Sequence, residues 1–355
     1  MDRTTATMLA AAVLVVLVGA SGDQRPALAQ ATEAPAKELG SRIVFSSTHH
    51  VIPEPPPGLD ADPKMQIYVM NGDGSAQTRL TDFFGFKIGA VCAPDGRQIA
   101  FHSLTPLASS AVPTIFLMNL DTFVDASGAG LTELVSGGLF PSWSPDGKKI
   151  AFQSPPPRRD VFVIDLMTLE ITNLTNDPND PSDDAWDDFR PDWSPDGRKI
   201  AFTSNRDGSP EIYVMNADGS NPVRLTFSNG ATSSAPDWSP DGKQIVFQSN
   251  RDFFPSFPNL ETDPGSEIYV MNADGTGQTR LTVNLSRDLD PAWSPNGKHI
   301  VFDSDRVIAL TKQVYVMNAD GSDQRALTNA PGESAHAGWC RGHEPGDARK
   351  QVSEQ

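Results

Sequence analysis

The sequence predicts an all-β protein, a six-bladed β-propeller closed by pairing of the C-terminal strand with the N-terminal blade. Three observations predict this fold: a motif of the form WSPDGKKIAF recurs along the chain, the copies follow one another at similar intervals, and the first and last repeats are incomplete in complementary ways. Repeat periods of 20–50 residues or slightly more mark propellers and other repeat arrays. The first residue of the motif, here called the tryptophan position, falls at Cys92, Trp143, Trp193, Trp238, Trp293 and Trp339.

Each repeat contains four short apolar runs, and each run predicts a strand. The first ends at the tryptophan position, and the second reads Ile-Ala-Phe or Ile-Val-Phe, as at 200–202. The third resembles Ile212-Tyr213-Val214, and the fourth ends in Leu-Thr, as at 225–226. Short runs rich in β-branched and aromatic residues, bounded by turn residues, are typical of strands.

The turns between these runs are as regular as the runs themselves. Ser-Pro-Asp-Gly suits a type I turn with proline at its second position, followed by a glycine in the left-handed region. Asn216-Ala217-Asp218-Gly219 and its copies at 272–275 and 318–321 close a second hairpin. In an up-and-down sheet both turns lie on one face of the ring. The other connections vary in length and lie on the opposite face, here called the variable-loop face.

The number of blades follows from the two ends of the repeat array. The runs are apolar on both pleat faces, so neighbouring sheets must cover both, and a ring of blades does this without helices. The chain opens with the second-type run Ile43-Val44-Phe45 and closes with the first-type strand at Trp339. We expect this last strand to complete the first sheet, which gives six blades over residues 42–341.

The segments outside the repeats predict export. Residues 8–18 are an eleven-residue apolar run followed by small residues, which is the pattern of a signal peptide over 1–29, with an alternative cleavage after Ala20. The run is shorter than the roughly 20 residues of a spanning helix. A retained N-terminal anchor is the alternative. We expect a linker over 30–41, a disordered tail over 342–355, no membrane span in the mature chain, and a periplasmic or secreted protein.

The net charge argues against two classes of ligand, and the two cysteines raise the question of a disulfide. The formal net charge is −17, and such a surface repels nucleic acid and anionic lipid. Cys92 occupies a tryptophan position and Cys340 directly follows one, so both lie on innermost strands of adjacent blades. Their opposite pleat parity makes them either face each other as a disulfide or point apart as two free thiols.

The motifs WSPDGRKIAF, IYVMNADGS and RLT resemble the WD40-like PD40 repeat of the TolB propeller family, over about residues 42–341. The resemblance implies a non-catalytic scaffold that docks a protein partner, such as a peptidoglycan-associated lipoprotein. TolB carries an α/β domain ahead of its propeller, whereas only residues 30–41 separate the expected signal from the first strand here. Similar repeats form the propeller of prolyl-oligopeptidase-type enzymes, which implies a hydrolase partner as another alternative.

The variable-loop face is the candidate site, because loops on a rigid scaffold commonly carry function. Residues three to six before the tryptophan positions are expected to approach the channel mouth there and to bind a ligand or partner: Asp187, Asp188, Arg190, Arg287, Asp288, Asp290, Glu333 and His336. The acidic loop that follows Asn176 is expected to be solvated. A calcium ion is the alternative, since carboxylates are its preferred ligands, with Asp177, Asp180, Asp183 and Asp184 as its weak candidates.

The sequence gives little support for catalysis. The closest approach to a G-x-S-x-G nucleophile motif, Gly332 to His336, lacks the second glycine, and the six histidines show no metal-site spacing. The leading hypothesis is therefore an exported, monomeric propeller that binds a protein or cell-envelope ligand without a cofactor. A calcium-dependent hydrolase or lyase that uses channel-mouth carboxylates is the alternative from another class.

Overall fold

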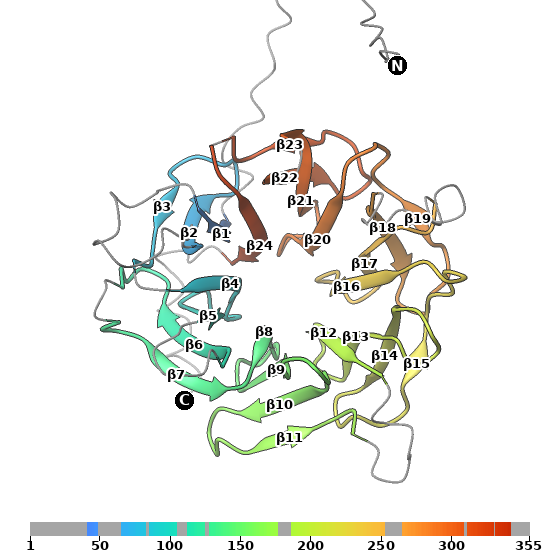
Figure 1. Cartoon of the computed structure of the whole chain (residues 1–355), viewed down its shortest axis with the longest axis horizontal. Helices are drawn as coiled ribbons and strands as arrows, with labels where there is room; N and C mark the ends of the chain where they lie inside the picture. Colours follow the sequence, from blue (N-terminus) through green and yellow to red (C-terminus); the bar gives the residue numbers. More distant parts are fainter. Residues whose placement is uncertain are drawn as a thin grey trace, which may run out of the picture. The chain divides into compact units, whose positions relative to one another are not determined.

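The structure, a computed structural model of the 355-residue chain, describes residues 41–48, 65–82, 85–104, 112–124, 128–176, 186–252, 265–308, 311–329 and 331–341. Within these ranges the strands form six four-stranded antiparallel sheets arranged as blades around a central channel (Figure 1). No helix in the described ranges is long and apolar enough to cross a bilayer. The predicted all-β, six-bladed propeller is confirmed.

Every blade runs outward from the channel in chain order, except that the last strand of the chain is the innermost strand of blade 1 (Figure 1). Blade 1 comprises β24 (Ser334–Cys340), β1 (Arg42–Ser47), β2 (Gln66–Asn71) and β3 (Thr78–Arg79). Blade 2 comprises β4 (Phe86–Cys92), β5 (Gln98–Leu104), β6 (Thr114–Asn119) and β7 (Thr132–Ser136). Blade 3 comprises β8 (Leu139–Trp143), β9 (Lys149–Gln153), β10 (Val161–Asp165) and β11 (Ile171–Asn173).

The remaining three blades are near copies of one another. Blade 4 comprises β12 (Asp188–Trp193), β13 (Lys199–Ser204), β14 (Glu211–Asn216) and β15 (Val223–Arg224). Blade 5 comprises β16 (Ser233–Trp238), β17 (Gln244–Ser249), β18 (Glu267–Asn272) and β19 (Thr279–Arg280). Blade 6 comprises β20 (Asp288–Trp293), β21 (His299–Ile308), β22 (Thr311–Asn318) and β23 (Arg325–Ala326).

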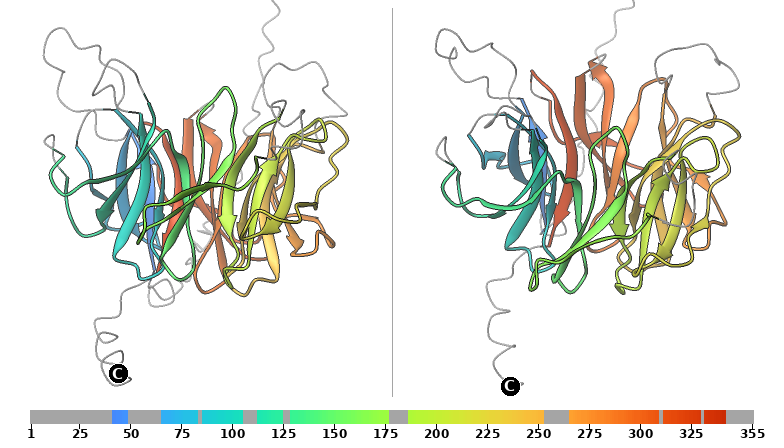
Figure 2. Two further views of the ribbon diagram at one scale, coloured as in Figure 1. Left: turned by 90° about the horizontal axis from the view of Figure 1, so that it is seen from below. Right: turned by 60° about the horizontal axis from the view of Figure 1, so that its bottom comes forward.

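The hydrophobic core lies between the blades, which stand side by side around the channel axis (Figure 2). One cluster joins Val246 and Ile268 of blade 5 to Trp293, Ile300 and Phe302 of blade 6, and all five are buried. Burying a side chain of this size stabilises the fold by about 1.5–3 kcal/mol. Because each interface is built by two neighbouring blades, a single blade cannot bury both of its apolar faces alone.

The Ser-Pro-Asp-Gly turns are built by their own side chains. In blade 3, Asp146 accepts hydrogen bonds from the Ser144 hydroxyl at 2.7 Å and the Lys148 main-chain N–H at 3.1 Å. These two bonds hold the pKa of Asp146 below its usual value. Gly147 has a φ of +69°, the left-handed conformation that the sequence predicts for this position.

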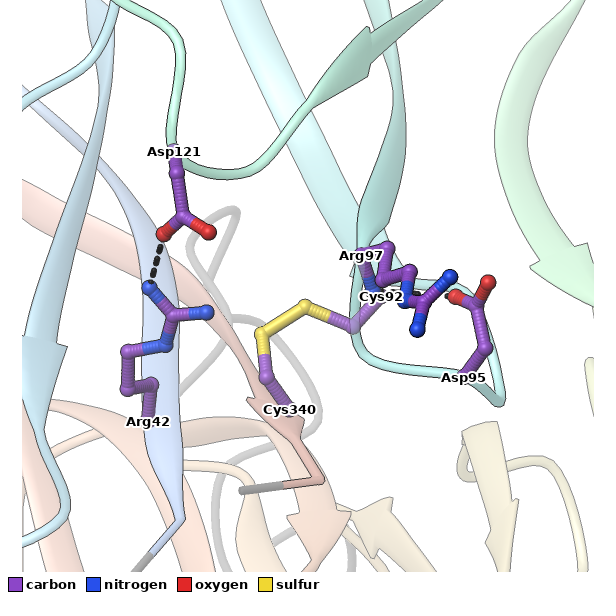
Figure 3. Close-up of a disulfide and its surroundings, with 6 residues drawn as sticks. All are labelled: Arg42, Cys92, Asp95, Arg97, Asp121 and Cys340. Atoms are coloured by element: carbon purple, nitrogen blue, oxygen red, sulfur yellow. Dashed lines mark hydrogen bonds and ion pairs between the residues drawn. A yellow bond between two sulfur atoms is a disulfide. The ribbon is translucent and has the colours of Figure 1, made fainter. Parts of the chain in front are cut away.

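The ring is closed where the two ends of the described chain meet. Strand β24 pairs with β1 in antiparallel register, with Trp339 opposite Ile43. A disulfide joins Cys340 of β24 to Cys92 of β4, with their Cα atoms 5.2 Å apart (Figure 3). The two cysteines therefore face each other across the interface between blades 1 and 2. The bond links positions that are 248 residues apart in the sequence.

Candidate functional site

All six innermost strands share an irregularity three residues before the tryptophan position. The pairing register with the second strand shifts there in every blade. The residue at the shift has a positive φ of 48–65° in each case, although only one of the six is a glycine. Such a bulge re-aims a side chain, and a non-glycine residue in this conformation costs about 1–3 kcal/mol. These residues are here called the channel ring: Gly89, Phe140, Arg190, Ala235, Asp290 and His336.

Side chains of the preceding blade hold the bulges in place. In five blades the main-chain N–H of the ring residue donates a hydrogen bond to a side chain of the preceding blade. The acceptor residue directly follows the Ile-Ala-Phe or Ile-Val-Phe run of that blade, or its equivalent. The donor–acceptor distances are 2.9 Å for Arg190 to Gln153 and 2.8 Å for His336 to Asp303. The other three pairs are Phe140 with His102, Ala235 with Thr203, and Asp290 with Gln248.

Four ring side chains contact one another in a closed circuit, here called the plug: Phe140, Arg190, Asp290 and His336. The guanidinium carbon of Arg190 lies 3.7 Å from the centre of the Phe140 ring, and Arg190 Nη1 lies 2.7 Å from Asp290 Oδ1. Asp290 Oδ2 lies 3.0 Å from His336 Nδ1, and the rings of His336 and Phe140 are 6.1 Å apart. Because Arg190 and Asp290 come from blades 4 and 6, and Phe140 and His336 from blades 3 and 1, the contacts span the channel.

The plug is charged, and its charges are balanced locally. Burial alone would raise the pKa of Asp290, but the positive charges of Arg190 and His336 outweigh it and hold that pKa below its usual range. Behind the plug, burial and then repulsion by Asp290 raise the pKa of Asp303 to about 7. Burial, followed by the charges of His336 and Arg190, lowers the pKa of His102 well below its usual value.

Two further carboxylates lie directly before the tryptophan positions of blades 4 and 5, and Asp192 and Asp237 are here called the carboxylate pair. Asp192 accepts hydrogen bonds from the Ser142 hydroxyl and the Trp238 main-chain N–H, both at 2.9 Å. Asp237 accepts one from the Trp293 main-chain N–H at 2.7 Å. Burial raises the pKa of Asp192 to about 6; burial and then the charge of Asp192 raise that of Asp237.

The channel ring and the carboxylate pair line a cavity of about 310 Å³. Its wall also includes Trp143 and Trp339, and it extends to Pro145 of a Ser-Pro-Asp-Gly turn, to Pro94 of the equivalent Ala-Pro-Asp-Gly turn in blade 2, and to Arg341 just after β24. The cavity therefore lies on the Ser-Pro-Asp-Gly side of the plug. The variable-loop face lies on the other side.

The structure brings together three of the eight residues that the sequence singled out, since Arg190, Asp290 and His336 all line the cavity. The other five do not line it. Asp188 and Asp288 are buried and form ion pairs with Arg206 at 2.9 Å and Arg306 at 2.6 Å.

The remaining three of those eight residues also have contacts away from the cavity. Asp187 lies 3.8 Å from Arg159, and Arg287 forms a 2.8 Å ion pair with Asp305. The main-chain groups of Glu333 bond to Ser47 and Thr48. Asp177, Asp180, Asp183 and Asp184 lie outside the described residues, as do 1–40 and 342–355.

Sequence reasoning missed Phe140, the carboxylate pair and Asp303. The signal that could have found Phe140 and the carboxylate pair is the comparison of equivalent positions in the repeat. Three residues before the tryptophan position the copies read Gly, Phe, Arg, Ala, Asp and His, and directly before it they read Val, Ser, Asp, Asp, Ala and Gly. Both positions vary while the flanking residues repeat, which indicates that neither is fixed by packing between blades.

A metal ion has one candidate position among the described residues. Asp290, Asp303 and His336 each offer a ligand atom, and these atoms lie within 4.8 Å of one another. Oxygen and imidazole ligands suit divalent cations. However, the guanidinium of Arg190 lies against Asp290 and repels a cation there. The arrangement supports ion pairing within the protein better than metal binding.

Comparison with known proteins agrees with this architecture. The family model described as the TolB beta propeller domain (PD40) matches residues 109–259 and 257–343. The chain belongs to the TolB β-propeller family. Within this family, a stretch of 92 residues is 46% identical to the Tol-Pal system protein TolB of Geobacter metallireducens, and it covers 26% of this chain and 18% of that protein. The match thus spans about a fifth of that relative's length.

Solved structures of TolB proteins share the fold of this propeller. The crystal structure of TolB from Acinetobacter baumannii superposes with a TM-score of 0.64 and 21% identity, over 85% of this chain and 67% of that one. The putative TolB from Agrobacterium tumefaciens gives a TM-score of 0.56 and 20% identity, over 82% and 90% of the respective chains. At such identities the likeness concerns the fold alone.

Proposed function

We propose that this TolB-family propeller is an exported, non-catalytic scaffold that binds a protein or cell-envelope ligand at its channel. The cavity of about 310 Å³ carries the proposal, because its lining differs from blade to blade on a backbone that is otherwise repeated. Strained bulges at six equivalent positions, five of them occupied by residues other than glycine, favour function over packing as the reason for the ring residues. The Ser-Pro-Asp-Gly side is the preferred entrance, since Asp188 and Asp288 of the variable-loop side are engaged in buried ion pairs.

A protein partner is favoured over a small substrate. A relative in the family is named as a component of the Tol-Pal system, which makes a peptidoglycan-associated lipoprotein the first partner to test.

A charge swap provides the test. The double variant Arg190→Asp/Asp290→Arg keeps the ion pair but reverses its polarity across the channel. The matched control is Arg42→Asp/Asp121→Arg, which swaps an ion pair of exposed Asp121 outside the cavity lining. Binding to the purified soluble part of the source organism's peptidoglycan-associated lipoprotein is measured by calorimetry, and cross-linked envelope proteins are identified by mass spectrometry. We expect the channel swap to weaken capture at least about tenfold. Equal capture by wild type and both swaps contradicts the proposal.

Export is tested separately on the full chain. A tagged chain is expected in the periplasm or medium with an N-terminus at Gln30 or Ser21, which correspond to the two predicted cleavage sites. Recovery of the uncleaved chain in the membrane fraction contradicts export and supports a retained anchor.

A further inference from the structure

The cavity has an acidic region with which its cationic lining residues, Arg190 and Arg341, form no ion pair. Arg190 is neutralised by Asp290, which also contacts His336. The carboxylate pair, in contrast, forms no ion pair with any described residue. Its hydrogen-bond donors are the neutral Ser142 hydroxyl and main-chain N–H groups.

Two neighbouring carboxylates without a counter-ion are unfavourable for the fold itself. Both Asp192 and Asp237 are half-buried, and their remaining exposure is to the cavity that they line. Each repels the other's charge, and each has lost much of its hydration, so a bound cation would relieve both costs. Titratable groups arranged in this way in a cleft are candidates for ligand contacts.

The shape and walls of the cavity indicate an organic cation. A volume of about 310 Å³ is at the lower end of small-ligand pockets and far exceeds the volume of a bare metal ion. The wall contributed by blades 1 to 3 contains Trp143, Trp339, Pro94 and Pro145. Aromatic and proline surfaces cover methylene groups well, and aromatic faces attract ammonium groups.

From this cavity we infer that the carboxylate pair receives the primary ammonium group of a lysine side chain from a partner protein, entering from the Ser-Pro-Asp-Gly side. The inference rests on the proposed function and names the chemistry of its ligand. A compact ammonium with three donors suits carboxylates that come from two separate blades. The plug lies at the inner end of the cavity, and the tryptophans and prolines contact the lysine methylenes.

The test uses short peptides and the intact protein. The probe Ac-Gly-Lys-Gly-NH2 is compared with the same peptide carrying norleucine, which has the methylenes but no charge. Calorimetry gives the affinity, and indole N–H signals of Trp143 and Trp339 in ¹H–¹⁵N NMR spectra report on the cavity wall. We expect the lysine peptide to bind at least about tenfold more tightly than the norleucine peptide.

Two double variants complete the design. Asp192→Asn/Asp237→Asn removes both charges but keeps oxygen acceptors for the main-chain N–H groups, and it is expected to remove the preference for lysine. Glu133→Gln/Glu170→Gln removes two exposed carboxylates elsewhere and is expected to leave the preference unchanged. Equal binding of the two peptides, or an unchanged preference in Asp192→Asn/Asp237→Asn, overturns the inference. Displacement of the lysine peptide by an equimolar amount of CaCl2 also overturns it, in favour of a metal site.

The failure of this inference differs from the failure of the proposed function. If envelope proteins are captured in a plug-dependent way but the peptides do not distinguish lysine from norleucine, the scaffold function stands and the lysine site falls. If the lysine peptide binds selectively but no partner is captured, the cavity chemistry stands and the partner proposal falls.

Discussion

Removing the disulfide that closes the ring should destabilise the protein without changing its fold. The bond between Cys92 and Cys340 spans 248 residues, so in the chain-entropy model it restricts a very large loop of the unfolded chain. For that loop the model gives about 5.5 kcal/mol at 25 °C, and measured losses for native disulfides are typically about 2–5 kcal/mol. We therefore expect Cys92→Ser/Cys340→Ser to lose about 4 kcal/mol, a large part of the 5–15 kcal/mol typical of folded proteins.

The assay is equilibrium unfolding in urea, followed by tryptophan fluorescence and by circular dichroism. Wild type is measured with and without a reducing agent, because reduction removes the cross-link while leaving both side chains in place. The reduced wild type and the double variant should unfold at similar urea concentrations, both well below the oxidised wild type. The variant itself should not respond to the reducing agent.

Pairing of β24 with β1 should persist without the bond, because the backbone register that places Arg42 opposite Cys340 and Ser47 opposite Ser334 does not depend on the sulfurs. A difference in unfolding free energy below about 1 kcal/mol between the oxidised wild type and the variant would refute the entropic account. Loss of the native dichroism spectrum in the variant without urea would instead refute the assumption that strand pairing alone holds the ring closed.

Three further outcomes follow from the structure. Arg190→Met leaves its carboxylate partner buried beside one histidine, so its free energy of unfolding should fall by about 2 kcal/mol at pH 7.5. Arg42→Met, in an exposed pair, should lower it by under about 1 kcal/mol, and equal urea midpoints of the two variants would contradict this. Burial, followed by the charge of Asp192, raises the pKa of Asp237 in the folded state, so the folded protein loses stability as pH rises above the ordinary carboxyl range. Asp237→Asn should therefore gain stability relative to wild type between about pH 4 and pH 8, as checked by unfolding across that range. Gly219→Ala should lose about 2 kcal/mol more than Gly137→Ala, because both have φ near +85° but only at Gly219 would the new Cβ lie 2.5 Å from a main-chain oxygen; thermal unfolding of the pair measures it.

The fold could be predicted from the sequence because equivalent side chains pack in the same way between each pair of neighbouring blades. The phenylalanine of the second strand illustrates this: Phe202, Phe247 and Phe302 are all fully buried between blades. Because the side chain at this position must fill the same space in each blade, the same residue type occurs there in each repeat. The closure could be predicted for a related reason, since Trp339 and Ile43 each lacked the partner strand that the other supplies.

The candidate site was only partly predictable, because the sequence gives distance along a strand but not the side to which a bulge turns a residue. Asp288 and Asp290 are two residues apart and looked equivalent. The register shift between Leu289 and Ala292 separates them: Asp288 is buried against Arg306, and Asp290 lines the channel. A regular strand would have placed both on one pleat face.

The channel ring shows why a repeat protein can carry a specific site on a uniform frame. All six ring positions have a positive φ, and in five of them a main-chain hydrogen bond to the preceding blade fixes the bulge, so the identity of the ring side chain is not needed to form it. Gly89 and Ala235 demonstrate this, since they occupy the ring without contributing to the plug. Where the backbone conformation is fixed but the side chain is not, the side chain can be replaced by one of different chemistry with little effect on packing. Phe140, Arg190, Asp290 and His336 thus give the channel four different chemistries on one shared backbone conformation.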